Sequence, residues 1–138
     1  MGNPSSGSPP VFNSVFTLIL KPNMARYTSS FLIGVKAEYL HSLIIQLLED
    51  CGFSVQFYSH DYIMASEIPG KVAFSKLVAI EVLVDKSKAE NETWINLVVK
   101  SEELPLRLDN HCRQVFDQIR QEVEDNRKWQ LIESVVNF

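Results

Sequence analysis

The hydrophobic pattern changes its period at Gly52, and this change constrains the fold more than any other feature of the chain. The apolar residues before Gly52 are Leu40, Leu43, Ile44, Leu47, Leu48 and Cys51. Their spacing of three and four residues places them on one face of an α-helix. A glycine directly after such a stripe is the residue that a left-handed helix cap favours. The sequence therefore predicts a helix that ends at Gly52.

After Gly52 the apolar residues recur at every second position, which is typical of β-strands. In the first strand Phe53, Val55 and Phe57 alternate with Ser54, Gln56 and Tyr58. Further strands are predicted at 62–67, 74–85 and 93–100, separated by turns and by a charged loop at 86–92. A strand is also predicted before the helix, in the β-branched and aromatic run 27–35.

A second helical stripe follows the strands. Its apolar residues are Leu108, Cys112, Val115, Phe116, Ile119 and Val123. One flank of this helix alternates in charge along Asp109, Arg113, Asp117, Arg120 and Glu124. Such spacing forms stabilising pairs on a solvated helix surface, so we interpret this stretch as a helix face and not as a catalytic cluster. The helical phase breaks near Asp125, and we expect residues 126–138 to kink away and dock separately.

The order strand, helix, four strands, helix predicts an α+β protein. We expect a single antiparallel sheet of about five strands with the helices packed on one face. Residues 11–138 form this one domain behind a flexible Ser/Pro/Gly tail at 1–10. The layout resembles one half of a TATA-binding-protein-like fold, and it also resembles secretion-chaperone-like domains. This is a resemblance of element order, which implies a fold and no activity.

Composition argues against several classes of function. A net charge of −4 over 138 residues is unlike a protein that grips nucleic acid through phosphates, so we expect no nucleic-acid partner. Stacking of single-stranded bases on Tyr58 and Trp94 is the remaining alternative of that kind. The apolar run 11–20 is about half of a membrane span, so we expect no transmembrane segment and a cytoplasmic location.

The residues also give no pattern for a metal, a cofactor or a nucleophile. The three histidines lie apart in the sequence without metal-ligand spacing, two cysteines are too few for a zinc site, and no glycine-rich phosphate loop occurs. His111 and Cys112 are adjacent, so on a helix they point in different directions and cannot pair as base and nucleophile. An enzyme or a redox switch built on Cys51 and Cys112 is the alternative, but we expect buried, inert thiols and no enzymatic activity.

The second face of the sheet is the candidate site. Alternation places Val78, Ile80, Val82, Ile95, Leu97 and Val99 on the face beneath the helices. The opposite face is then predicted to display Leu77, Leu83, Trp94 and Val98, together with Tyr58 and Tyr62. An apolar outer face of this kind marks an interaction surface, unless the run 11–20 or 129–138 folds over it.

This face leads to a functional expectation. We expect a non-enzymatic protein-binding or adaptor module that self-associates through the outer sheet face as a homodimer. The alternative is a carrier that holds a small apolar ligand between the sheet and the helices.

Overall fold

The computed structural model describes residues 24–85, 91–106 and 109–137. Within these residues six strands form one antiparallel sheet in the order β2-β3-β4-β5-β1-β6. The strands are β1 (Arg26–Gly34), β2 (Phe53–Ser59), β3 (Tyr62–Glu67), β4 (Ala79–Asp85), β5 (Glu92–Lys100) and β6 (Gln130–Asn137). The helices are α2 (Ala37–Asp50), α3 (His111–Asp125) and the short 3-10 helix η1 (Phe74–Lys76). The predicted α+β class is confirmed, with six strands in place of about five.

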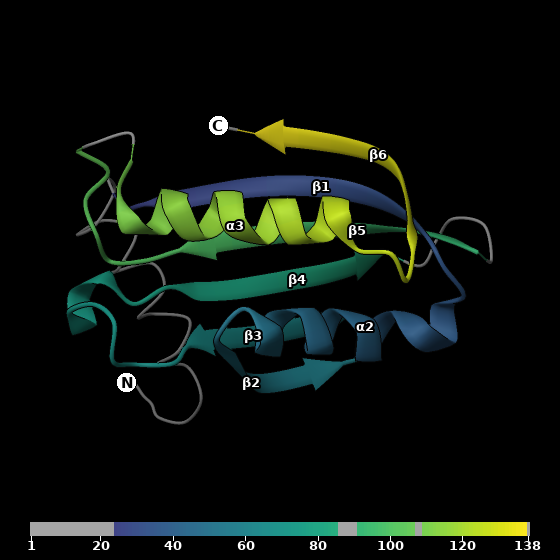
Figure 1. Ribbon diagram of the computed structural model, residues 1–138, viewed down its shortest axis with the longest axis horizontal. Helices are drawn as coiled ribbons and strands as arrows, with labels where there is room; N and C mark the ends of the chain where they lie inside the picture. Colours follow the sequence, from purple (N-terminus) through teal and green to yellow (C-terminus); the bar gives the residue numbers. More distant parts are fainter. Residues whose placement is uncertain (1–23, 86–90, 107–108, 138) are drawn as a thin grey trace, which may run out of the picture.

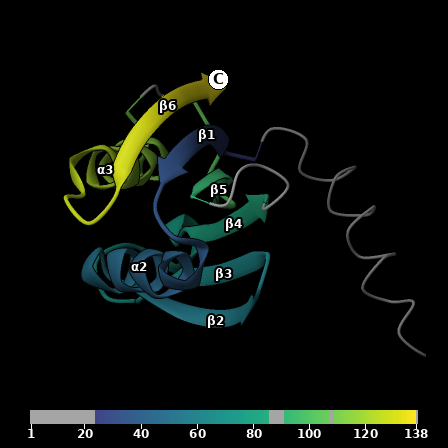
Figure 2. The same ribbon diagram turned by 90° about the vertical axis from the view of Figure 1, so that its right-hand side faces the viewer.

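Both α-helices lie on the same face of the sheet. In Figure 1, α2 runs in front of β2 and β3, and α3 runs in front of β5 and β1. Figure 2 shows the sheet from its side, with the two helices next to each other on one side of it. The other face of the sheet carries no helix from the described part of the chain. We call the helix-bearing side the inner face and the opposite side the outer face.

Helix α2 forms where the apolar stripe predicts it. Leu40, Ile44, Leu47 and Leu48 are its buried residues. The helix ends at Asp50 with Cys51 as its cap, and Gly52 follows with a φ of 89°, a left-handed conformation that a side chain would strain. The Gly52 carbonyl then accepts a hydrogen bond from the Ile68 amide, which ties the end of the helix to the end of β3.

The core lies between the inner face and the helices. Alternate residues of β4 and β5 are buried there, as the period-two pattern predicts. Helix α3 covers them with five buried residues, Cys112, Val115, Phe116, Ile119 and Val123. No helix of the described residues is both long enough and apolar enough to cross a membrane.

The chain after α3 differs from its prediction. Trp129 is buried and donates a hydrogen bond from Nε1 to the Val123 carbonyl at 3.0 Å. The following residues form β6, which pairs antiparallel with β1 at the edge of the sheet. The predicted separate docking of residues 126–138 is therefore wrong, because Leu131 and Val136 turn toward the core and complete the sheet. The C-terminal run does not fold over the outer face either, and residues 11–20 lie outside the described residues.

The predicted strand at 74–85 is shorter in the structure. Phe74–Lys76 forms η1, and β4 begins only at Ala79. Leu77 lies in the link between the two, with its amide bonded to the Phe74 carbonyl at 3.2 Å. A Pro-Gly turn pair begins this connection and keeps its first residues out of the sheet. Leu77 is therefore not a residue of the outer face of β4.

Candidate functional site

The strand registers arrange the outer face in rows that cross the sheet. Directly paired residues of antiparallel strands point to the same side. A middle row consists of Tyr62, Leu83, Asn96, Ser30 and Val135, one from each of β3, β4, β5, β1 and β6. Leu83 and Val135 are each 42% exposed. Between them the Ser30 hydroxyl donates to the Asn96 side-chain oxygen at 2.6 Å.

The row toward the Gly34 end of β1 consists of Asp85, Trp94, Leu32 and Glu133. Here two half-buried apolar side chains are flanked by two acidic residues. Glu92, one pair further along, adds a third carboxylate at this end. Because the acids flank the apolar pair, this end of the outer face is negative.

On the other side of the middle row lies a row that consists of Phe57, Met64, Glu81, Val98, Thr28 and Asn137. Beyond it, Lys100 and Arg26 pair with each other across β5 and β1. Because Lys100 is paired with Glu81, the net positive charge of this end of the outer face comes from Arg26.

A polar chain crosses three strands of the outer face. The Tyr62 hydroxyl donates to Glu81 Oε2 at 2.9 Å, and Lys100 Nζ donates to the same oxygen at 3.3 Å. Burial, followed by the hydrogen bond and the negative charge of Glu81, raises the pKa of Tyr62 to about 12. Phe57 lies against Tyr62 with a ring-centroid distance of 6.0 Å. The phenol is therefore held in place on both sides.

Of the six residues predicted for this face, four lie on it. Leu83, Trp94, Val98 and Tyr62 all occupy the rows described above. Val98 is only 6% exposed, so it offers little contact area to a partner. Leu77 is off the strand, as described for the β4 boundary.

Tyr58 is predicted on the outer face but lies on the inner one. A register shift between Val55 and Phe57 places Tyr58 opposite Ile63, a core residue. Such a bulge adds one residue to the strand and reverses the side on which the later residues point. Phe57 takes the outer position instead, and Tyr58 projects from the sheet edge, 62% exposed.

Sequence reasoning missed four apolar residues of the outer face. Phe57 is hidden by the bulge, and Val135 belongs to a strand that was not predicted. Leu32 and Met64 lie on predicted strands, and their alternation with buried Ile33 and Ile63 is the signal that identifies their side.

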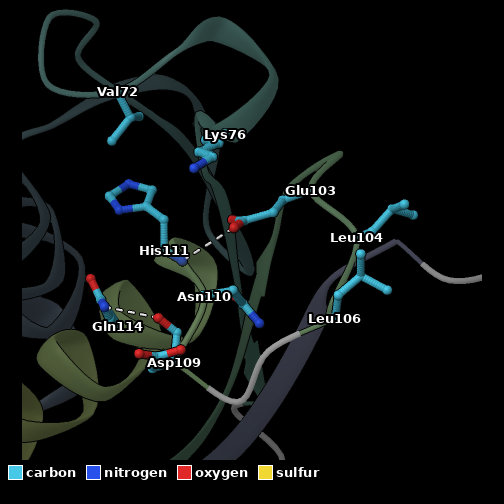
Figure 3. A pocket seen from close by; sticks show the side chains of 9 residues that line it. All are labelled: Val72, Lys76, Glu103, Leu104, Leu106, Asp109, Asn110, His111 and Gln114. Atoms are coloured by element: carbon cyan, nitrogen blue, oxygen red, sulfur yellow. Dashed lines mark hydrogen bonds between the residues drawn. The ribbon is translucent and has the colours of Figure 1, made fainter.

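A hollow of about 480 Å³ lies at the loop end of the molecule. Figure 3 shows it between the loop that carries Val72 and Lys76 and the loop that carries Leu104 and Leu106, with the start of α3 as its floor. Its remaining lining residues are Glu103, Asp109, Asn110, His111 and Gln114. This hollow combines apolar rims with a polar floor.

The floor of the hollow is organised around the first turn of α3. The Asn110 side chain accepts from the Arg113 amide at 2.9 Å, which caps the helix. The Glu103 carboxylate lies 3.4 Å from the amides of His111 and Cys112, where an anion is favoured by the helix N-terminus. A carboxylate of the chain itself therefore occupies this position.

His111 is tied to β3 by a hydrogen bond to Glu67. Its Nε2 lies 2.9 Å and 3.1 Å from the two carboxylate oxygens of Glu67, and Glu67 Oε1 also accepts the Val78 amide at 3.0 Å. Both side chains are largely buried. The pair joins three segments of the chain, which is a structural role for the histidine at the rim of the hollow.

The two cysteines are packing residues. Cys112 is fully buried and Cys51 is half-buried, and both are free thiols. Burial raises the pKa of each thiol to about 11. A thiol with a raised pKa is a poor nucleophile at neutral pH. Among the described residues, no group of three or more His, Cys, Asp or Glu side chains is placed to hold a metal ion.

The space between the sheet and the helices is filled by side chains. A cavity of about 10 Å³ lies there among Phe31, Leu48, Val82 and their neighbours. This volume holds one water molecule at most and is far below a drug-sized ligand pocket of about 300 Å³.

The chain matches no known protein-family model and no curated protein. The outer face and the edges of the sheet are therefore the features that indicate a function.

Proposed function

We propose that this chain is a non-enzymatic protein-binding module, and that two copies of it associate through their outer sheet faces. The observation behind this proposal is the outer face, which no helix of the described residues covers and where Leu83 and Val135 are exposed beside half-buried Trp94, Leu32 and Tyr62. The outer face of an antiparallel sheet is normally polar where it meets water. Apolar side chains gathered on such a face mark a contact surface.

The distribution of charge favours a second copy as the partner. One end of the outer face carries Asp85, Glu92 and Glu133, and the other carries Arg26 and Lys100. Two copies can stack about a two-fold axis that runs across the strands, so that their strands are antiparallel. The acidic end of each copy then faces the basic end of the other, which favours this register over a parallel one.

The middle row lies on the axis of this arrangement. Its residues Leu83 and Val135 then face the same row of the second copy. Since sheets pack about 10 Å apart, side chains from the two rows interdigitate in the space between them. The polar chain from Tyr62 to Lys100 keeps its own hydrogen bonds within this interface.

The alternative, a carrier of a small apolar ligand between the sheet and the helices, has less support. The cavity in that position is about 10 Å³, whereas a bound organic ligand needs about 300 Å³ or more. The hollow at the loop end is larger, but it lies outside the sheet–helix interface.

The matched substitutions Leu83→Glu and Leu106→Glu test the proposed interface. Both leucines are exposed, but Leu83 lies in the middle of the outer face and Leu106 at the loop-end hollow. A charge buried without a partner costs at least about 2 kcal/mol at an interface centre, or about 30-fold in the dissociation constant. We expect sedimentation-equilibrium measurements to show this weakening for Leu83→Glu only.

Circular dichroism of the same two variants checks that each is folded. An L83E protein with the wild-type association constant would refute the interface. Equal weakening by both substitutions would refute it as well, since Leu106 is remote from the outer face.

A further inference from the structure

Strand β6 presents an open edge whose one irregularity, between Leu131 and Glu133, lies near its start. It is the last strand in the sheet order, so one side of its backbone pairs with β1 and the other pairs with no described strand. Its sequence, QLIESVVN, contains one charged residue, Glu133, and no Lys, Arg or Pro. Proteins usually block a long open edge with such residues, because unpaired amides and carbonyls recruit another strand.

The opposite edge of the sheet is different. Strand β2 is interrupted by the bulge near Gln56, and α2 packs beside it. The His41 ring donates a hydrogen bond to the Ser59 carbonyl at 2.6 Å, so a side chain already occupies part of that edge. In β6, by contrast, five consecutive residues from Glu133 to Asn137 pair with β1 in uniform register.

We infer that β6 pairs antiparallel with β6 of a second copy, so that the sheets of two chains join at this edge. A two-fold axis perpendicular to the sheet relates the copies. If the axis passes midway between Val135 and its counterpart, the five regular residues all pair. Val135 then faces its counterpart, and Glu133 faces the counterpart of Asn137. An axis through Glu133 would place two carboxylates directly opposite each other, which is destabilising.

The charged flank of α3 supports this partner independently. Along the helix Arg113, Asp117, Arg120 and Glu124 alternate in sign, with ion pairs of 3.2 Å, 3.3 Å and 3.8 Å between successive residues. The other flank of α3 faces α2, where Glu122 and Asp125 lie opposite that helix. The alternating flank therefore points toward the side of the sheet where β6 lies (Figure 1).

This flank is complementary to itself. When two α3 helices run antiparallel about the β6 axis, Arg113 is level with Glu124 of the second copy, and Asp117 with its Arg120. All four facing pairs are then of opposite charge. The order plus, minus, plus, minus gives this match only in the antiparallel arrangement that a two-fold axis imposes.

The midpoint of the charged flank of α3 and the proposed β6 axis lie at the same position along the strand direction. Helix α3 begins beside Tyr27, whose hydroxyl accepts from the Asn110 side chain at 2.8 Å. At about 1.5 Å per residue, the midpoint between Asp117 and Arg120 lies about 12 Å further along. On β1, at about 3.3 Å per residue, this corresponds to Ser30 or Phe31. Their partners on β6 are Val135 and Ser134.

The helices do not touch in this arrangement. Helix α3 packs over β1 and β5, so the two α3 axes are separated by about four strand spacings, or about 19 Å. Long side chains narrow the gap to about the 8 Å over which charges interact at physiological salt. The flanks therefore select the antiparallel register, while the backbone hydrogen bonds of β6 hold the copies together.

This inference does not depend on the proposed outer-face interface, and it is tested in a protein that lacks that interface. Val135→Cys and Glu133→Cys are compared in a Leu83→Glu, Cys51→Ser chain under mild oxidation. Val135 and its counterpart would be about 5 Å apart between Cα atoms, which a disulfide spans. Glu133 and its counterpart would be about 14 Å apart, which a disulfide cannot span. We expect a covalent dimer from Val135→Cys only.

The second test introduces a lysine on the inner side of the sheet, at one edge strand or at the other. Ser134→Lys introduces the charge at β6, and Tyr58→Lys introduces it at the exposed edge of β2. We expect Ser134→Lys alone to abolish the Val135→Cys crosslink, and added salt to slow the crosslinking. Equal crosslinking of Val135→Cys and Glu133→Cys, or a crosslink that persists with Ser134→Lys, would overturn the inference. The crosslinking results are separate from the association constants of the Leu83→Glu and Leu106→Glu variants. Failure of the β6 pairing can therefore be distinguished from failure of the outer-face interface.

Discussion

Tyr62 shows at the scale of one residue how the outer face is both apolar and specific. Its ring adds apolar area beside Phe57, and its hydroxyl is fixed by Glu81. Lys100 balances the charge of that carboxylate from the next strand. A tyrosine held in this way contributes contact area without adding an unpaired polar group to an interface.

Titration of the tyrosines tests this environment. Since the pKa of Tyr62 is raised from 10.0 to about 12, the folded chain keeps this proton over a pH range where the unfolded chain loses it. The stabilising contribution is therefore complete below pH 10 and is lost as the pH rises toward 12. We expect Tyr62→Phe to remove the last step of the phenolate absorbance titration. Glu81→Gln should move that step to lower pH, and an unchanged step would refute the assignment.

The sequence could predict the face of the sheet on which most strand residues lie. It could not predict contacts that depend on distant parts of the chain. Leu83 and Trp94 are on the predicted face because regular alternation places them there. Tyr58 is on the other face because one bulge near Gln56 reverses the alternation. The Glu67–His111 pair joins residues 44 positions apart, and no local pattern indicates such a contact.

At the scale of elements, α3 uses one periodic pattern for two purposes. Its apolar stripe fills the core, and its charged flank stacks Arg113 over the Tyr27 ring and Arg120 over the Phe116 ring, at 5.8 Å and 5.6 Å from the ring centroids. The sequence predicted both the stripe and the solvated flank, because a helix follows a short repeat. It did not predict β6, because a change of phase after Asp125 shows where a helix ends but does not identify the next element.

The start of α3 depends on Asn110. Its side chain caps the helix by accepting from the Arg113 amide, and it donates to the Tyr27 hydroxyl. We expect Asn110→Ala to lower the free energy of unfolding by about 1–2 kcal/mol, because the cap is lost. Asn110→Asp keeps the acceptor and should cost less. Urea denaturation followed by helical circular dichroism measures both, and equal losses would show that capping is not the cause.

At the scale of the whole molecule, the two proposed interfaces have compatible symmetry. The outer-face axis runs across the strands along the row that contains Leu83 and Val135. The β6 axis is perpendicular to the sheet and crosses that row midway between the two Val135 residues. Two perpendicular two-fold axes that intersect generate a third, so that the two contacts together close into a tetramer and do not extend into a filament.

Native mass spectrometry therefore has a defined set of expected masses, based on a chain of 15.8 kDa. We expect the wild-type protein at high concentration to be a tetramer, because each chain then uses both contacts. Leu83→Glu removes one contact and should leave a dimer joined at β6, whereas Ser134→Lys removes the other and should leave a dimer joined at the outer face. The double variant should be a folded monomer. Higher oligomers that grow with concentration would contradict the closed symmetry, since only non-intersecting axes allow continued addition of chains.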